Sequence, residues 1–314
     1  MDLQPRVEPL QGMVECVLVL VAPGQGAQTP GFLAPWLELP GLADRLGAWS
    51  EVAGIDLIAY GTTAGADEIR DTAVAQPLLV AAALASAEAL GVRPDVLAGH
   101  SVGEFAVAAL AGVLTAEQAL ALVRERAQAM AKAAAITETG MTAVLGGAED
   151  EVLAAIDRHG LTPANINGAG QIVAGGTLEE LAAFAEDAPA RARLRPLSVA
   201  GAFHTRHMAP AVESLRAAAE GVTPADPRVT LLSNADGRPV AGGAEFVERL
   251  VKQVSSPVRW DACMETMAGL GVTRMIELLP GGTLTGLAKR GLRGVATVAL
   301  KTPDDLDAAR ELIK

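Results

Sequence analysis

The chain is poor in cysteine. Its 314 residues contain only Cys16 and Cys263. Two cysteines so far apart provide neither a disulfide framework nor the ligand spacing of a metal site, and this fits a reducing cytosol. We therefore expect a cytoplasmic protein that has no bound metal.

Aromatic residues and positive charge are also scarce. Five Phe, three Trp and one Tyr are present, and 25 Lys and Arg face 37 Asp and Glu, which gives a net charge of −12. Nucleic-acid-binding proteins need a basic surface and often stack bases on aromatic rings. The longest purely apolar run, Leu78–Ala85, is much shorter than the roughly 20 residues of a membrane span. Neither nucleic acid nor a membrane is therefore an expected partner.

The first residues have no periodic pattern. Residues 1–13 contain Pro5, Pro9 and a few charges of mixed sign, which is unlike a secretory signal. We interpret residues 1–13 as a disordered leader or an alternative start, and we expect the folded protein to begin near Val14.

Alternating strand and helix patterns fill most of the chain. Val17–Ala22 is a continuous apolar run, typical of a strand buried on both faces. A long alanine-rich helix is expected from Gln76 to about Leu90, and Thr115 and Gln118 form a capping box that predicts the start of another long helix. Other core elements are expected as strands at Val96–Ala98, Thr230–Ser233, Arg274–Leu279 and Ala296–Leu300, and as helices at Phe246–Gln253, Pro257–Leu270 and Thr283–Lys289.

The middle of the chain follows a different order. Residues 138–200 predict strand, helix, two strands, helix and strand, which is the order of a ferredoxin-like unit. We therefore expect an α/β fold. Residues 14–137 and 201–314 would form a core around a parallel sheet, and residues 138–200 a ferredoxin-like insertion.

A candidate nucleophile lies between a predicted strand and a predicted helix. The segment Gly99-His100-Ser101-Val102-Gly103 matches G-x-S-x-G in that context. A tight strand-to-helix turn pushes the serine outward, and the helix N-terminus supplies N–H groups for a developing oxyanion. The pattern predicts a nucleophilic Ser101, although a glycine-rich turn before a helix is also a common structural device.

A nucleophilic serine needs a base, and the chain has four histidines. We expect His100 to point away from the neighbouring Ser101 hydroxyl, and His159 fits a solvated helix end. His204 and His207 lie together where the predicted insertion returns to the core. Residue types and spacing do not choose between these two.

Arg126 lies on an apolar stripe of its predicted helix, which also carries Ala119, Leu122, Val123 and Met130. A buried arginine requires an anion or a heavy desolvation cost. A core ion pair or an arginine that extends to the surface would satisfy this. The alternative is a guanidinium fork that holds a substrate carboxylate bidentately.

These motifs together resemble a known family, the malonyl-CoA:acyl-carrier-protein transacylases of type II fatty acid and polyketide synthesis. The resemblance runs from about Val17 to Leu300 and includes the nucleophile motif and Arg126. The other similar segments are Pro23-Gly24-Gln25-Gly26-Ala27-Gln28, Asn165-Ile166-Asn167 with Gly170-Gln171, Ala202-Phe203-His204, Ser256-Pro257-Val258-Arg259-Trp260 and Glu277-Leu278-Leu279-Pro280-Gly281. The family architecture is an α/β-hydrolase-like core that carries a ferredoxin-like insertion.

The resemblance implies a catalytic assignment. Ser101 would be the nucleophile and His204 the base, because His204 follows Ala-Phe. The backbone carbonyl of Gln253 would orient the histidine. The backbone N–H groups of Gln25 and Val102 would form the oxyanion hole.

The resemblance also implies how the acyl group is held. Arg126 would bind the malonyl carboxylate, with Asn165 and His100 nearby in the cleft. A ring at Phe203 favours malonyl over methylmalonyl, because it leaves little room beside Cα. This chain departs from the family at Gly201, where a histidine is common, so the contacts of that side chain are absent or replaced.

The implied reaction is ping-pong transfer through a malonyl-serine, from malonyl-CoA to the phosphopantetheine thiol of holo acyl carrier protein. No permanently bound cofactor and a monomer are expected. The alternatives are a serine esterase or thioesterase, a methylmalonyl-type acyltransferase, an inactive carrier-protein-binding scaffold and a patatin-like Ser/Asp lipase. An arginine on an apolar stripe has no use in a plain esterase.

The net charge of −12 poses a problem for this partner, because acyl carrier proteins are acidic as well. A local basic patch would have to attract the carrier protein against the global field. The alternative is that the basic residues are scattered solubilising charges. The candidate contacts are Arg191, Arg193, Arg195, Lys289, Arg290 and Arg293.

Overall fold

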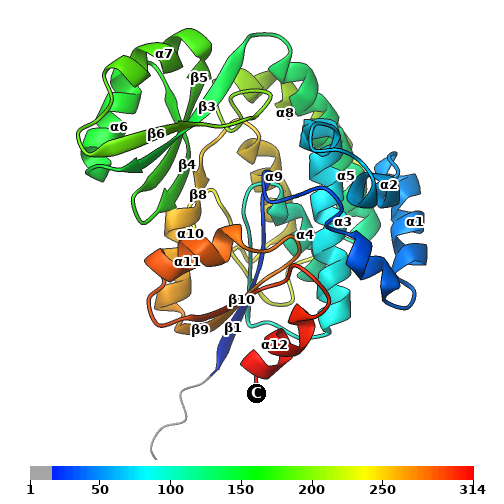
Figure 1. Cartoon of the computed structure of the whole chain (residues 1–314). Helices are drawn as coiled ribbons and strands as arrows, with labels where there is room; N and C mark the ends of the chain where they lie inside the picture. Colours follow the sequence, from blue (N-terminus) through cyan, green and yellow to red (C-terminus); the bar gives the residue numbers. More distant parts are fainter. Residues whose placement is uncertain (1–15) are drawn as a thin grey trace, which may run out of the picture.

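The computed structural model describes residues 16–314, so the predicted leader at residues 1–13 lies outside the described residues. It contains two sheets, one in the lower half of the molecule and one above it in Figure 1. The fold is therefore mixed α/β with a parallel sheet and a second sheet.

The lower sheet is parallel throughout, in the order β10-β9-β1-β2-β7. Its central strand carries Leu18 and Leu20 into one hydrophobic cluster and Val19 and Val21 into another on the opposite face. The prediction of a strand buried on both faces is confirmed. The strands are β1 (Val17–Ala22), β2 (Val96–Gly99), β7 (Thr230–Leu231), β9 (Val272–Glu277) and β10 (Ala296–Ala299).

Helices cover both faces of this sheet, with α3 and α5 on one side of the molecule and α10 and α11 on the other (Figure 1). The helices of the core are α1 (Leu42–Ala53), α2 (Leu57–Thr62), α3 (Thr72–Leu90), α4 (Gly103–Leu110), α5 (Ala116–Ala134), α8 (Ala209–Ala219), α9 (Gly243–Gln253), α10 (Trp260–Gly269), α11 (Thr283–Gly291) and α12 (Asp305–Leu312). Short 3-10 turns occur at Ala34–Glu38, Glu68–Arg70 and Arg206–Met208.

The long buried helix begins earlier than expected. Its start at Gln76 was wrong: α3 begins at Thr72, because the Asp71 side chain accepts a hydrogen bond from the N–H of Ala73 at 2.7 Å and caps the first turn. Pro77 lies inside the helix, where the loss of one backbone hydrogen bond is tolerated. By length and hydropathy α3 is also long and apolar enough to cross a membrane. However, 78% of that stretch is buried inside the protein, which is typical of a core helix.

The upper sheet has the order β6-β3-β5-β4-β8, and its first four strands pair antiparallel. Residues 258–259, which we had expected in a helix, instead form β8 and pair parallel with β4, so the core chain contributes an edge strand. The elements here are β3 (Thr139–Gly146), α6 (Glu149–Arg158), β4 (Thr162–Gly168), β5 (Gln171–Thr177), α7 (Leu178–Glu186), β6 (Ala192–Pro196) and β8 (Val258–Arg259).

Candidate active site

Ser101 occupies a strained turn between β2 and α4. Its φ is 53°, in the left-handed region that non-glycine residues rarely adopt. A Cβ on Gly99 would lie 2.1 Å from the backbone of Gly103, and a Cβ on Gly103 would lie 2.2 Å from the carbonyl oxygen of Ala22. Both glycines are therefore required for the close packing that exposes the serine.

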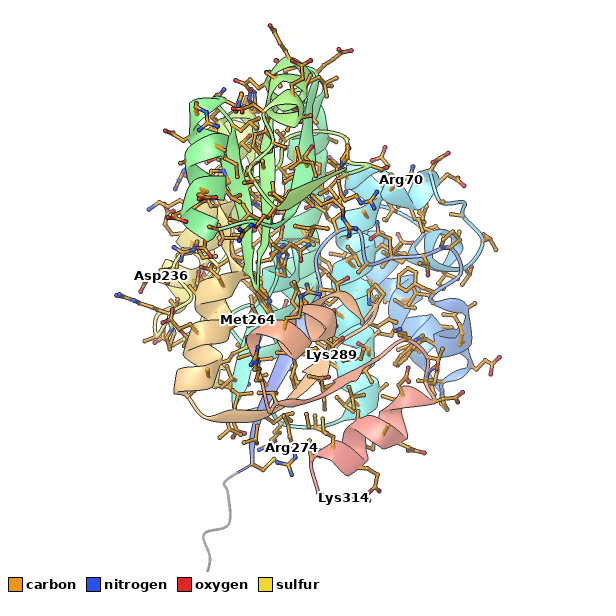
Figure 2. The ribbon with its side chains drawn as sticks, turned by 60° about the vertical axis from the view of Figure 1, so that its left-hand side comes forward. Arg70, Asp236, Met264, Arg274, Lys289 and Lys314 are labelled. Atoms are coloured by element: carbon orange, nitrogen blue, oxygen red, sulfur yellow. The ribbon has the colours of Figure 1, made fainter. Side chains whose placement is uncertain are left out.

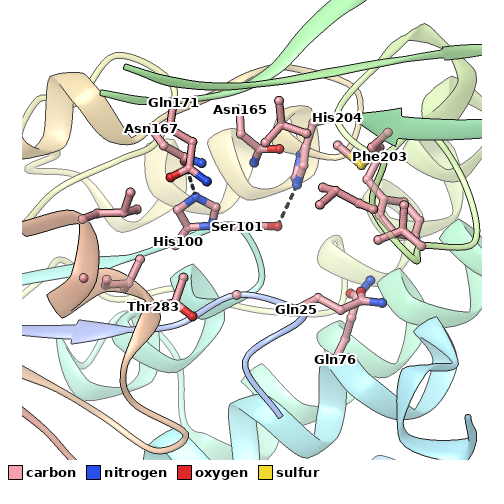
Figure 3. A pocket seen from close by; sticks show the side chains of 18 of the residues that line it. Gln25, Gln76, His100, Ser101, Asn165, Asn167, Gln171, Phe203, His204 and Thr283 are labelled. Atoms are coloured by element: carbon pink, nitrogen blue, oxygen red, sulfur yellow. Dashed lines mark hydrogen bonds between the residues drawn. The ribbon is translucent and has the colours of Figure 1, made fainter. Parts of the chain in front are cut away.

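The structure brings Ser101 and His204 together. Ser101 Oγ lies 2.7 Å from His204 Nε2, and His204 Nδ1 lies 2.8 Å from the carbonyl oxygen of Gln253 (Figure 3). A carbonyl acceptor requires the proton on Nδ1, which leaves Nε2 free to accept from the serine. Of the two histidines that the sequence left open, His204 makes the contact, whereas the Nε2 of His207 is buried without a partner among residues 16–314.

The electrostatic environment keeps His204 neutral. Burial and the nearby charge of Arg126 lower the pKa of His204 to about 3. An imidazole that is neutral at physiological pH is ready to accept a proton from a serine hydroxyl.

Two backbone N–H groups next to the serine have no internal acceptor. Within residues 16–314, neither Gln25 nor Val102 donates its backbone N–H to a protein acceptor. Gln25 lines the cavity, and Val102 is the residue that precedes α4. Such N–H groups are suited to hold a developing negative charge on a substrate oxygen.

Arg126 is fully buried, at 1% exposure, and makes no ion pair within residues 16–314. Its Nη1 donates to Oε1 of Gln76 at 2.5 Å, and its Nη2 donates to Oε1 of Gln253 at 2.9 Å. Nη2 also lies 3.4 Å from Ser101 Oγ. No carboxylate oxygen lies within 4.0 Å of its nitrogens in residues 16–314. The structure therefore contradicts both the core ion pair and the arginine that reaches the surface.

Burial lowers the pKa of Arg126 without removing its charge at neutral pH. Desolvation lowers its pKa to about 10, against the attraction of Glu104, so the guanidinium remains charged at neutral pH. Its Nε is also buried without a partner within the described chain. A charged donor whose partners are neutral oxygens is well suited to bind an anion that enters the cavity.

These groups line a cavity of about 400 Å³ between the two sheets. Asn165 and Phe203 both line it, and Figure 3 shows Asn165 close to Ser101 and His204. His100 points away from the serine hydroxyl, as expected, because its Nε2 lies 2.9 Å from Oδ1 of Asn167. Burial lowers the pKa of His100, so it too is neutral.

Gly201, where the family often has a histidine, lies against α5. A Cβ there would be 2.8 Å from the Cβ of Ala134. A larger side chain at position 201 would therefore crowd helix α5.

The six candidate basic residues are all exposed, and none forms an ion pair within residues 16–314. Strand alternation places Arg193 and Arg195 on the face of the upper sheet opposite Leu194, which packs toward the helices of that unit. Figure 2 shows Lys289 on α11, and Arg290 lines the cavity and donates to Gln171 at 3.5 Å.

Sequence reasoning missed several residues that hold this site. Gln76 and the side chain of Gln253 contact Arg126, and buried Glu104 and Asn234 lie behind the serine turn. A signal existed for Glu104, which is a charged residue in the otherwise apolar helix GEFAVAAL. The same reasoning that singled out Arg126 applies to it.

Comparisons with known proteins agree with this geometry. The acyl transferase domain family matches residues 19–307. The malonyl CoA-acyl carrier protein transacylase of Mycobacterium bovis is 54% identical over 94% of this chain and 100% of its own length. The Escherichia coli transacylase is 34% identical over 93% and 98%.

Solved structures give the same result. The crystal structure of the Mycobacterium tuberculosis transacylase superposes with a TM-score of 0.91 at 53% identity, covering 95% of this chain and all of that one. A second match is a chain from the structure of a type II polyketide synthase acyl-carrier protein in complex with its malonyl-transacylase. It superposes with a TM-score of 0.87 at 30% identity, covering 94% of this chain and 99% of that one.

The fold and the Ser101–His204 pair therefore define an enzyme of the acyltransferase class. Within that class, the chain belongs to the malonyl CoA-acyl carrier protein transacylase family.

Proposed function

We propose that this acyltransferase moves a malonyl group from malonyl-CoA to the phosphopantetheine thiol of holo acyl carrier protein, for fatty acid or polyketide synthesis. One observation carries the proposal. Arg126 is a buried cation without a carboxylate partner in the described part of the chain, and its Nη2 lies 3.4 Å from the serine oxygen that would carry the acyl group. A malonyl group on Ser101 extends a carboxylate over the short distance to that guanidinium.

The first half-reaction forms an ester on Ser101. The serine oxygen attacks the thioester carbonyl while His204 Nε2 takes the proton, and the Gln253 carbonyl holds the imidazolium that forms. The N–H groups of Gln25 and Val102 hold the oxyanion. CoA leaves as the thiol after His204 returns the proton, and malonyl remains on the serine.

The second half-reaction reverses these roles. The phosphopantetheine thiol attacks the malonyl ester, His204 takes the thiol proton, and the proton then passes to Ser101 Oγ as that bond breaks. Malonyl-CoA, CoA and the carrier-bound thiol are substrates and products, and the protein needs no permanent cofactor for this chemistry.

The cavity also supports acyl selectivity. An acetyl group would leave the Arg126 charge buried without an anion, and breaking such a pair costs about 3–5 kcal/mol. Phe203, which is buried in the cavity wall, restricts the space for a methyl branch. Malonyl is therefore proposed over acetyl and methylmalonyl, with Asn165 and His100 completing the cavity wall.

We also propose the finer description of the fold. Residues 14–137 and 201–314 form an α/β-hydrolase-like core, and residues 138–200 form a ferredoxin-like insertion. The order β6-β3-β5-β4 supports the insertion, because it is the 4-1-3-2 arrangement that a βαββαβ chain gives in an antiparallel sheet.

The carrier protein is proposed to approach over the exposed cations beside the cavity. The candidates are Arg191, Arg193 and Arg195 at β6 and Lys289, Arg290 and Arg293 at α11. A local basic patch steers an acidic partner even when the net charge is unfavourable. A cytoplasmic monomer remains part of the proposal.

Mass spectrometry tests the function. The protein is mixed with malonyl-CoA, and holo acyl carrier protein is then added. A malonyl adduct on Ser101 that moves to the carrier thiol supports the proposal, and Ser101→Ala must show neither event. Rapid CoA release without an adduct would indicate a thioesterase instead, and the absence of any reaction would indicate a binding scaffold.

A further inference from the structure

A second buried ionisable side chain, Glu104, is connected to Arg126 through a single intervening residue, Gln253. Glu104 on α4 is 1% exposed, and its Oε1 accepts the backbone N–H of Asn234 at 2.7 Å. Its Oε2 accepts a hydrogen bond from Nε2 of Gln253. No Lys or Arg nitrogen lies within 4.0 Å of this carboxylate in the part of the chain that the structure describes.

The side-chain amide of Gln253 connects the two charges. An amide has a donating end and an accepting end, whereas a guanidinium only donates and a carboxylate only accepts. With Glu104 bound to Nε2, the oxygen Oε1 faces Arg126 and accepts from Nη2 at 2.9 Å. Nε2 also donates to the carbonyl oxygen of Ser101 at 3.2 Å and to Oδ1 of Asn234 at 3.3 Å. Glu104 is the one carboxylate among these three acceptors, and it therefore favours the orientation in which the amide oxygen meets the guanidinium.

We propose that Glu104 is a positioning residue that acts through Gln253 to aim Arg126 at the acyl group on Ser101. This inference rests on the proposed function, because it assigns Arg126 the substrate carboxylate. Glu104 attracts Arg126 through the relay without occupying the N–H groups that the substrate needs. A direct Glu104–Arg126 pair would compete with malonyl for those groups.

The same network connects the anion site to the base. The backbone oxygen of Gln253 holds His204 while its side chain holds Arg126, so one residue sets both distances to the serine. Asn234, which donates to Glu104, also accepts the N–H of Ser101 at 2.8 Å and donates to Gly99 at 2.8 Å. The serine turn, the base and the cation therefore share one rigid frame.

Opposing effects act on the pKa of Glu104. Burial raises the pKa of Glu104 to about 8, while the donors Asn234 and Gln253 and the charges of Arg126 and Arg249 act in the opposite direction. The hydrogen-bond pattern requires both carboxylate oxygens to accept, which favours the ionised form.

The test is the substitution Glu104→Gln, which keeps the shape of the side chain and removes its negative charge. A glutamine offers both a donor and an acceptor to Gln253, so the amide loses its carboxylate acceptor and is oriented only by the longer contacts of Nε2 with Ser101 O and Asn234 Oδ1. For malonyl-CoA we expect KM to rise and kcat/KM to fall about tenfold, the loss typical of one hydrogen bond to a charged group. For acetyl-CoA, which makes no use of Arg126, kcat/KM is expected to change less than about twofold on the same scale.

Glu277→Gln is the matched control. Glu277 is another buried glutamate at this sheet edge, but its four hydrogen bonds all come from residues 282–285. It is expected to leave the malonyl-to-acetyl ratio unchanged. An equal loss with both donors in Glu104→Gln would assign Glu104 a purely structural role and overturn the proposal.

A double-mutant cycle gives a second readout. In an Arg126→Ala background, Glu104→Gln is expected to have no further effect on malonyl transfer, because its effect passes through Arg126. A full tenfold loss in that background would contradict the relay. If Glu104→Gln fails to fold, Gln253→Met breaks the same connection while keeping the backbone carbonyl, and it must lower the malonyl-to-acetyl ratio in the same direction.

Failure of the proposed function is distinguishable from failure of the relay. If wild-type protein forms no malonyl adduct on Ser101, the function is wrong and the relay has no substrate to serve. If wild-type protein forms the adduct and Glu104→Gln keeps the wild-type malonyl-to-acetyl ratio, the function stands and the relay is wrong.

Discussion

Two strand-to-helix turns at the same edge of the parallel sheet are built in opposite ways. After β9, the Glu277 carboxylate accepts the backbone N–H groups of Gly282, Leu284 and Thr285, each at 2.8 Å, and the Thr285 hydroxyl at 2.9 Å. A negative charge at the N-terminus of α11 with every hydrogen bond satisfied stabilises the corner.

The turn after β2 leaves groups unsatisfied instead. Ser101 is strained at φ 53°. Within residues 16–314, the N–H of Val102 has no acceptor, and Arg126 meets amide oxygens and the Ser101 hydroxyl but no carboxylate. Backbone strain and incompletely paired charge concentrate where a substrate completes the arrangement. We therefore propose that the turn after β9 serves stability, whereas the turn after β2 serves chemistry at the expense of stability.

Among the substitutions near the turn after β2, removal of the base should have the largest effect on the reaction rate. His204→Ala is expected to slow malonylation of Ser101 about 10³-fold, because general-base assistance contributes roughly 10²–10⁴-fold. Rapid-quench mass spectrometry measures the adduct rate. A patatin-like Ser/Asp mechanism would instead retain most of its activity without His204.

The pH dependence of kcat/KM gives a second test of His204 as the base. Protonation of His204 disables the base, and its pKa is lowered to about 3. The acid limb of kcat/KM should therefore lie well below the ordinary histidine value of about 6.5. An acid limb centred near 6.5 would show that His204 is solvated in the working enzyme.

Removing the cation should separate the acyl donors. Arg126→Ala is expected to lower kcat/KM for malonyl-CoA about 10²-fold or more, since the malonyl carboxylate loses a buried partner. Acetyl-CoA transfer is expected to hold or improve. If both donors decline equally, Arg126 is structural and the specificity argument fails.

Charge reversal at the exposed arginines of β6 should have a smaller effect on the overall transfer reaction. Arg193→Glu with Arg195→Glu is expected to slow transfer to the carrier protein about tenfold at low salt, because steering changes association rates strongly. Malonylation of Ser101 from malonyl-CoA should stay unchanged. An unchanged rate of carrier transfer would mean that these arginines are only solubilising charges.

A substitution in the turn after β9 should have the smallest effect on catalysis. Glu277→Gln is expected to lower the free energy of unfolding by about 2 kcal/mol, since hydrogen bonds to a buried charge are lost. A thermal melt measures this loss. The kcat/KM of the folded protein should change less than about threefold, a limit set well below the effects of the catalytic substitutions. A loss of activity as large as that of Arg126→Ala would remove the distinction between the two corners.

The sequence predicted most of this comparison from local patterns. The glycines around Ser101 and the apolar stripe around Arg126 are short-range signals that depend on turn geometry and helix periodicity. The same patterns located the five strands of the parallel sheet and most of the helices that pack on it, whereas α1, α2, α8 and α12 were not predicted. The early start of α3 was missed, because the helix was expected to begin at Gln76 although Asp71 caps it.

The remaining features depend on contacts between distant segments. Residue types and spacing left His204 and His207 open, and only the family resemblance favoured His204, whose contact with the Gln253 carbonyl joins segments 49 residues apart. The pairing of β8 with β4 required the assembled insertion. Gln76, Asn234 and the Gln253 side chain are neutral polar residues that carry no local signal. Their role appears only when a buried charge is placed beside them.

A competition experiment tests the central claim most directly. Equal concentrations of malonyl-CoA and acetyl-CoA are mixed with the wild-type protein, and the acyl group on the Ser101 peptide is identified by mass spectrometry at early times. We predict an adduct that is almost entirely malonyl, and a loss of that preference in Arg126→Ala. Equal malonyl and acetyl adducts on the wild-type protein would contradict the account, because the unpaired buried arginine would then select nothing.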